Sequence, residues 1–262
     1  MPSALMYHDI VADADEDSSG FPGRDAATYK VNRELFEKHL RAIAARQPAG
    51  RGAPHTDVLI TFDDGGASAL TAADSLERHG FVGHFFVTTN YIGTPGFVHE
   101  HDIRELRRRG HAVGSHSCSH PLRMGHCSQP QLLDEWTRSR QRLEDVLGEP
   151  VRVASIPGGD FAPQVADAAA HAGFTRLFTS EPTREEWHAS GLTLVGRYTI
   201  RRWTTAETIA GLMSGAWLPC ARQAIAWNAR KMSKRLGGKQ YLKVRKLLLR
   251  HGDDVRWGDR SG

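Results

Sequence analysis

The sequence has few cysteines and no pattern that would pair them. Its 262 residues include three, Cys118, Cys127 and Cys220, an odd number without C-x-x-C spacing. Small secreted folds that depend on disulfides carry a denser, even set of cysteines. We therefore expect no disulfide framework and a reducing compartment.

Long apolar runs are also missing. No stretch approaches the about 20 apolar residues that a membrane-spanning helix needs. The first eight residues lack the basic start and long apolar segment of a secretory signal peptide. These absences predict a soluble, cytoplasmic protein, and the length suits one α/β barrel-sized domain.

Acidic residues are absent from one long stretch near the C-terminus. Between Arg222 and Arg250 there are ten cations and no acid, although the net charge of the whole chain is only +4. The rest of the chain is therefore mildly acidic. We expect two parts, a barrel over residues 1–215 and a basic helical extension over residues 216–262.

The most informative stretch lies around two adjacent acids. Residues 58–62 are apolar or β-branched and predict a short strand buried on both faces. The strand is followed by Asp63, Asp64 and two glycines, which allow a sharp turn. Neighbouring side chains of an extended chain point to opposite sides, so one carboxylate can bind a metal while the other faces substrate. The alternative is an Asx turn that caps the next helix.

A second polar motif follows some fifty residues later. His116 and His120 stand four residues apart, and a helical turn would bring both imidazoles within reach of one metal. Two histidines and one aspartate form a ligand set for Zn²⁺ or another first-row divalent metal. The alternative for such a pair is a structural or incidental role.

Strands and helices alternate along the chain at the spacing of parallel βα units. The candidate site residues His8, Asp63, Asp64, His116 and the Pro157 turn all come just after a predicted strand. Chemistry in α/β barrels gathers at the carboxyl ends of the strands, so these residues should share one rim. Strands are expected at 4–7, 58–62, 84–87, 111–113, 151–156, 175–178 and 193–198, and helices at 67–79, 102–109, 131–147, 162–172 and 205–213.

The two motifs resemble those of the polysaccharide deacetylases, the carbohydrate esterase family with the NodB-like domain. The resemblance rests on Thr61-Phe62-Asp63-Asp64-Gly65 and His116-Ser117-Cys118-Ser119-His120 and covers roughly residues 1–200. It implies a distorted (β/α)7 TIM-like barrel. It also implies that Asp63 is the catalytic base and that Asp64, His116 and His120 bind the metal, with Zn²⁺ favoured and Co²⁺, Ni²⁺ or Fe²⁺ as alternatives.

A third motif departs from the family pattern. Ser155 stands where the family usually carries an arginine, and Pro157 and Gly158 follow it in a strand-to-helix turn. The resemblance implies that Pro157 shapes the substrate groove and that the Gly158 N–H helps to hold an oxyanion. Arg197, on the last predicted strand, is a candidate partner for a site carboxylate or a substrate anion.

The expected acid is also out of place. Most family members carry a Leu-His motif on the last strand, but residues 192–198 contain no histidine. His8 ends the first strand instead, and the first and last strands of a closed barrel are neighbours. The chain thus resembles the circularly permuted branch, which includes the poly-N-acetylglucosamine deacetylases. This resemblance implies that His8 is the general acid, whereas Asp9 is expected to be structural.

The predicted activity is metal-dependent removal of an N-acetyl or similar N-acyl group from an amino sugar of a saccharide or glycoconjugate. A non-sugar amidase or deformylase with the same site, and a catalytically silent glycan-binding domain, are the alternatives. For a cytoplasmic enzyme the expected substrate is a short, nucleotide-linked or lipid-linked glycan. The basic extension is either a solvated helix packed on the barrel or a peripheral contact with the anionic inner membrane face. No nucleic-acid partner is expected, because the extension has no nucleic-acid recognition motif.

Overall fold

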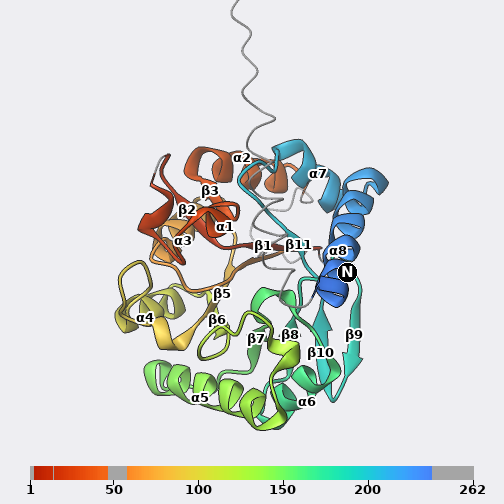
Figure 1. The fold of residues 1–262 in the computed structure, drawn as a ribbon. Helices are drawn as coiled ribbons and strands as arrows, with labels where there is room; N and C mark the ends of the chain where they lie inside the picture. Colours follow the sequence, from red (N-terminus) through yellow and green to blue (C-terminus); the bar gives the residue numbers. More distant parts are fainter. Residues whose placement is uncertain (1–2, 14, 47–57, 238–262) are drawn as a thin grey trace, which may run out of the picture.

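The structure is a computed structural model that describes residues 3–13, 15–46 and 58–237. Residues 47–57 and the part of the predicted extension beyond residue 237 lie outside the described residues. A curled parallel sheet forms the centre of the molecule (Figure 1). Its strands are β1 (Ser3–Tyr7), β4 (Val58–Phe62), β5 (Gly83–Val87), β6 (Ala112–Ser115), β7 (Val153–Ser155), β8 (Arg176–Phe178), β10 (Leu192–Val195) and β11 (Tyr198–Thr199).

The last strand closes the sheet into a barrel. β10 pairs in parallel with β8, and β11 pairs in parallel with β1. Only Gly196 and Arg197 separate β10 from β11, so one interrupted strand joins both ends of the sheet. A Cβ at Gly196 would lie 2.6 Å from the carbonyl oxygen of Glu181, which is why glycine stands at the interruption. The ring of seven parallel strand positions confirms the predicted (β/α)7 barrel.

Helices cover the outside of the barrel (Figure 1). Such a helix packs on the strands through an apolar stripe along one of its faces. In α5, Leu132, Trp136, Leu143 and Val146 recur at helical spacing and are buried. The helices are α1 (Arg24–Ala27), α2 (Arg33–Ala44), α3 (Ala69–Arg78), α4 (Glu100–Arg108), α5 (Gln129–Leu147), α6 (Pro163–His171), α7 (Ala206–Ser214) and α8 (Trp217–Gly237).

The strands pack a different core on each face. Alternate residues of β1 divide between the two, because successive side chains point to opposite faces. Leu5 and Tyr7 belong to the large cluster between sheet and helices. Ala4 joins Phe86, Phe178 and Val195 from β5, β8 and β10 in a small inner cluster. The inner cluster fills the barrel, so the polar residues beyond it gather at one end.

Three strands were not predicted. β2 (Asp9–Val11) pairs with β3 (Lys30–Asn32) in a separate two-stranded sheet, and β9 (Glu186–Ala189) adds an antiparallel edge to β10. β6 begins at Ala112 and runs to Ser115, two residues beyond the predicted end. The longer β6 brings His116 directly to the strand end.

The C-terminal extension begins as a helix that contacts the barrel. In α8, Gln223 Nε2 donates to the Thr199 carbonyl at 2.8 Å, and Tyr198 OH donates to Cys220 Sγ at 3.4 Å. Ile225 and Met232, which stand seven residues apart and so share one face of α8, are 69% and 63% exposed. The helix therefore packs on the barrel through its other side. No helix in the described ranges combines the length and apolar character needed to cross a membrane.

Candidate metal and catalytic site

The predicted site residues lie at one rim of the barrel. His8 follows β1, Asp63 and Asp64 follow β4, and His116 follows β6. Because all these strands are parallel neighbours, their carboxyl ends meet at the same edge. The rim predicted from strand positions alone is therefore present.

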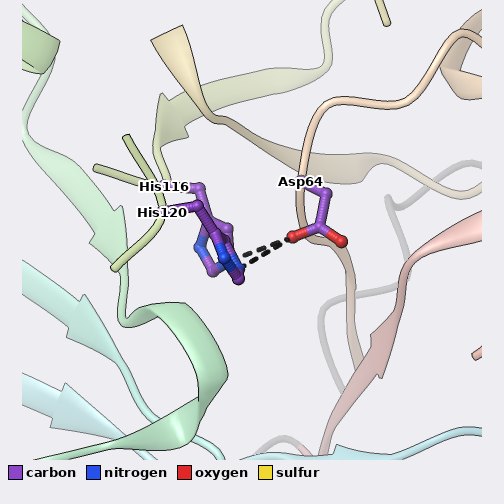
Figure 2. A group of neighbouring side chains, drawn as sticks. All are labelled: Asp64, His116 and His120. Carbon is purple, nitrogen blue, oxygen red and sulfur yellow. Dashed lines mark ion pairs between the residues drawn. The ribbon is translucent and has the colours of Figure 1, made fainter. Parts of the chain in front are cut away.

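Asp64, His116 and His120 converge on one point (Figure 2). Asp64 Oδ1 lies 3.3 Å from His116 Nε2 and 3.4 Å from His120 Nε2. Within the described part of the chain, this is the one group of His, Cys, Asp or Glu side chains that could hold a metal ion, and its ligand atoms all lie within 4.8 Å of one another. Three protein ligands leave coordination positions open, as in catalytic rather than structural zinc sites.

The backbone reaches this arrangement through left-handed turns and not through a helix. Asp64, Ser117 and His120 have φ values of +76°, +64° and +58°. The helical turn expected over residues 116–120 is therefore wrong. A left-handed residue other than glycine costs about 1–2 kcal/mol, and such strain concentrates at functional sites. Here the left-handed residues turn both histidines towards Asp64.

A glutamate that sequence reasoning missed holds the 116–120 turn. Glu135, on α5, accepts hydrogen bonds from the backbone N–H groups of Cys118 and Ser119 at 2.9 and 2.8 Å. The Ser119 hydroxyl donates to its other oxygen at 2.5 Å. Glu135 stands among other charged residues of a surface helix, so nothing in the sequence distinguishes it. Its role depends on the packing of α5 beside β6.

The tautomer of His116 follows from its second nitrogen. His116 Nδ1 lies 3.0 Å from the Ser155 carbonyl oxygen. A carbonyl oxygen only accepts, so Nδ1 carries the proton and Nε2 presents its lone pair to the site. Metal-binding histidines are usually oriented in this way.

Asp63 has quite different surroundings from Asp64. The fully buried Arg197 guanidinium donates to Asp63 Oδ1 at 2.7 Å and to Oδ2 at 2.8 Å, and the Ser155 hydroxyl donates to Oδ2 at 3.1 Å. Burial alone would raise the pKa of the Asp63 carboxyl, but the positive charge and the hydrogen bonds of Arg197 outweigh it and lower the pKa. Asp63 is therefore a carboxylate at neutral pH.

Arg197 uses every donor that it has. Besides Asp63, it donates to the Thr179 carbonyl, the Thr61 hydroxyl and the Ser155 hydroxyl at 2.7–2.9 Å. Its guanidinium also lies over the rings of Phe86 and Phe178. Of the two alternatives for Arg197, the structure places it against a site carboxylate.

His8 lies beside the same carboxylates. A proton on His8 would lower the pKa of both Asp63 and Asp64, and the His8 ring centroid is 4.8 Å from that of Tyr29. His8 Nδ1 is buried and has no hydrogen-bond partner among the described residues. The imidazole is thus within the site.

The third motif forms a short 3-10 turn, Pro157–Gly159, directly after β7. Pro157 is buried, whereas Gly158 is exposed and has a φ of +60°. Cys118 is not part of the ligand set, and its Sγ donates to Asn90 Oδ1 at 3.0 Å.

Comparison with known proteins places this site in a family. Residues 50–177 match the family model for polysaccharide deacetylase. This part of the chain is a polysaccharide deacetylase domain. The chain is 24% identical over 231 residues to YxkH of Bacillus subtilis (strain 168), whose name assigns it to the same family, with 82% of this chain and 75% of that protein covered.

A second relative of this deacetylase domain is a longer protein. The peptidoglycan-N-acetylglucosamine deacetylase PgdA of Listeria monocytogenes is 34% identical over 113 residues, which cover 42% of this chain but only 23% of PgdA. The shared part is therefore less than a quarter of PgdA.

Solved structures support the fold of this chain. The Streptococcus pyogenes deacetylase PplD, in complex with acetate, has a TM-score of 0.65 at 20% identity and covers 81% of this chain and 97% of its own. The de-N-acetylase of Aggregatibacter actinomycetemcomitans has a TM-score of 0.65 at 19% identity, with 80% and 98% covered. The distorted barrel is thus shared across distant sequences.

Proposed function

We propose that the protein is a metal-dependent hydrolase that removes an N-acetyl, or similar N-acyl, group from an amino sugar of a saccharide or glycoconjugate. The observation that carries this proposal is that two adjacent carboxylates have different partners. Asp64 faces two imidazole nitrogens, whereas Asp63 is held by Arg197. One carboxylate is arranged to bind a cation and its neighbour to take a proton.

The environment of the ligand atoms fits a divalent metal ion. Asp64 Oδ1 is buried and lacks a hydrogen-bond partner among the described residues, which is costly for a carboxylate oxygen. Two imidazoles and one carboxylate favour Zn²⁺, with Co²⁺, Ni²⁺ or Fe²⁺ as alternatives. When bound, such an ion polarises a carbonyl and lowers the pKa of its water towards about 7.

Asp63 is the proposed general base. Its lowered pKa keeps it ionised, and the bidentate contact with Arg197 fixes its orientation. It accepts a proton from the water that adds to the amide carbonyl carbon. Arg197 and Ser155 already hold the Asp63 carboxylate in place. The carboxylate therefore needs little movement to accept this proton.

His8 is the proposed general acid, and Gly158 contributes its backbone N–H to the oxyanion. When the C–N bond breaks, His8 gives its proton to the leaving amine, and a carboxylate is released. The position of β1 between β11 and β4 supports this assignment, because it brings an N-terminal histidine beside Asp63. It equally supports membership of the circularly permuted branch.

The proposed substrate class is an N-acetylated amino sugar in a short, lipid-linked or nucleotide-linked glycan. The name of PgdA describes a peptidoglycan N-acetylglucosamine deacetylase, which supports an acetylated amino sugar. We place the protein in the cytoplasm, with peripheral contact at the inner membrane face.

The membrane contact is proposed for the outer side of α8. Trp217, Leu218, Ile225 and Met232 are 51–79% exposed there. The sequence of α8 also contains five cations and no acid, namely Arg222, Arg230, Lys231, Lys234 and Arg235. Apolar and basic side chains together suit an anionic lipid surface. Failure of the protein to sediment with anionic vesicles at low salt would reject this contact.

The activity is tested by acetate release. We expect the metal-loaded protein to release acetate from N-acetylated amino sugars, in free, nucleotide-linked or lipid-linked form. Asp63→Asn should lower turnover by at least about 100-fold because the base is lost, and it should still bind metal. Asp134→Asn removes an exposed carboxylate on α5 and serves as the control, with unchanged turnover.

The same panel separates the alternatives. Acetate or formate release from simple amides, but not from sugars, would indicate a non-sugar amidase or deformylase. Glycan binding with no hydrolysis would indicate a silent binding domain. Full activity of Asp63→Asn would contradict the proposed mechanism.

A further inference from the structure

The two histidines of the site are supported in different ways. The Ser155 carbonyl oxygen holds the second nitrogen of His116 at 3.0 Å. Among the described residues, no other one forms such a hydrogen bond with the second nitrogen of His120, although the Nε2 of His120 faces Asp64 at 3.4 Å. Metal-binding imidazoles normally depend on an outer contact for their orientation. His120 therefore needs another kind of support.

An aromatic ring from a distant loop supplies it. The centroid of the Phe21 ring lies 4.9 Å from that of the His120 ring, at an interplanar angle of 49°. Ring contacts at this separation are attractive and restrict rotation. Phe21 is half-buried, so its ring covers one side of the imidazole.

Phe21 is itself fixed by two further rings. Its centroid lies 4.9 Å from Tyr91 and 5.1 Å from Phe97, both in edge-to-face geometry. Tyr91 and Phe97 are also in contact with each other at 4.7 Å. The three rings form one cluster, so movement of Phe21 would disturb both partners.

The backbone that carries Phe21 is tied to the barrel at several points. The Ser19 hydroxyl donates to the buried carboxylate of Asp9 at 2.5 Å, and the Ser19 carbonyl accepts from Lys30 Nζ at 2.6 Å. The Gly20 N–H donates to the Gly96 carbonyl at 2.7 Å. Asp9, expected to be structural, thus anchors the residues just before Phe21. This loop is built to hold one position.

We propose that Phe21 is a positioning residue for the metal site, which holds the His120 imidazole so that Nε2 faces Asp64. The inference rests on the proposed metal dependence, but not on the identity of the glycan. It assigns a role in metal binding to the 12–23 loop, which carries no metal ligand of its own. Loss of the Phe21 ring leaves the His120 imidazole free to rotate. Only Asp64 and His116 are then held in position to bind the metal.

The test measures metal affinity directly. Zn²⁺ binding is determined by competition with a chromogenic chelator, and Co²⁺ binding by its visible absorption spectrum. Phe21→Ala should weaken Zn²⁺ binding by at least about tenfold, the range seen when outer contacts of ligands are removed. The Co²⁺ spectrum should change, because it reports the ligand geometry. Leu122→Ala, which truncates a 65% exposed apolar residue near His120, is the control and should bind as wild type.

Phe21→Leu guards against loss of folding, because it keeps an apolar side chain in the cluster but no flat ring. It should also weaken Zn²⁺ binding, by several-fold. Wild-type affinity and spectrum in either variant, with the far-ultraviolet circular dichroism of the folded protein, would overturn the inference. If the wild type binds Zn²⁺ more tightly than the Phe21 variants but releases no acetate, the proposed activity is refuted and this inference still holds.

Discussion

Asp63 and Arg197 form the most constrained contact of the site. Both are buried, and the contact joins the ends of β4 and the last strand across the inside of the barrel. Ser155, which stands where the family resemblance implies an arginine, donates to Asp63 and accepts from Arg197. We therefore infer that Arg197 supplies, from another strand, the positive charge that Ser155 cannot.

Arg197→Met tests this pair. It leaves the Asp63 carboxylate buried without its cation, so we expect the free energy of unfolding to fall by about 3–5 kcal/mol. The pKa of Asp63 should rise, and turnover should fall at neutral pH. Urea unfolding measures the first effect. Arg201→Met, which truncates an arginine stacked on the half-exposed Trp203, is the control.

A double variant sharpens the result. Asp63→Asn in the Arg197→Met background removes the unpaired charge and should restore part of the lost stability. A loss below about 1 kcal/mol for Arg197→Met alone would show that the pair does not constrain the barrel.

At the scale of elements, strands with strong apolar patterns were predictable and turns were not. The run of residues 58–62 predicted β4 with its observed bounds. Five consecutive apolar or β-branched residues are typical of a strand that is buried on both faces. The 116–120 turn was predicted as helical from spacing alone, whereas Glu135 and the Ser117 side chain impose left-handed residues. That difference depends on a contact with α5, which no local pattern reports.

Gly114 tests how closely β6 must fit its neighbours. A Cβ at this position would lie 2.7 Å from the Phe86 ring and 2.7 Å from the Val153 carbonyl oxygen. Since a backbone atom cannot move aside cheaply, Gly114→Ala should cost about 1–3 kcal/mol of unfolding free energy. It should also weaken metal binding, because His116 follows two residues later. Unchanged urea unfolding and metal titration would contradict this account of β6.

At the scale of the whole molecule, the order of the barrel followed from alternating strands and helices, but its closure did not. The predicted strand at 193–198 is split at Gly196, where the sheet changes partner from β8 to β1. β2 and β3 are short and pair with each other from separate segments, whereas β9 pairs with β10 through the two-residue turn Ser190-Gly191. Single-segment patterns carry no information on such pairings.

His39 links three parts of the molecule and should make stability depend on pH. Its Nε2 donates to the Thr204 carbonyl at 2.7 Å, so Nδ1 accepts from Tyr7 OH at 3.2 Å. Burial lowers the pKa of His39 to about 4 from 6.5. Between these values the unfolded chain binds the proton more readily, so stability is full above pH 6.5 and falls with pH down to about 4.

For His39 alone the expected loss between pH 7 and pH 5 is about 2 kcal/mol. It is measured as the difference in pH dependence of urea unfolding between the metal-free wild type and His39→Gln. Identical pH profiles for the two proteins would contradict the assignment of His39 as a buried neutral imidazole.

The central claim is that Asp64, His116 and His120 bind one divalent ion while Asp63 does not. The most direct measurement is the metal content per chain after Zn²⁺ loading and desalting, determined by elemental analysis on wild type, Asp64→Asn and Asp63→Asn. The account predicts about one ion per chain for wild type and Asp63→Asn, and close to none for Asp64→Asn. Full metal content in Asp64→Asn, or its loss in Asp63→Asn alone, would contradict it.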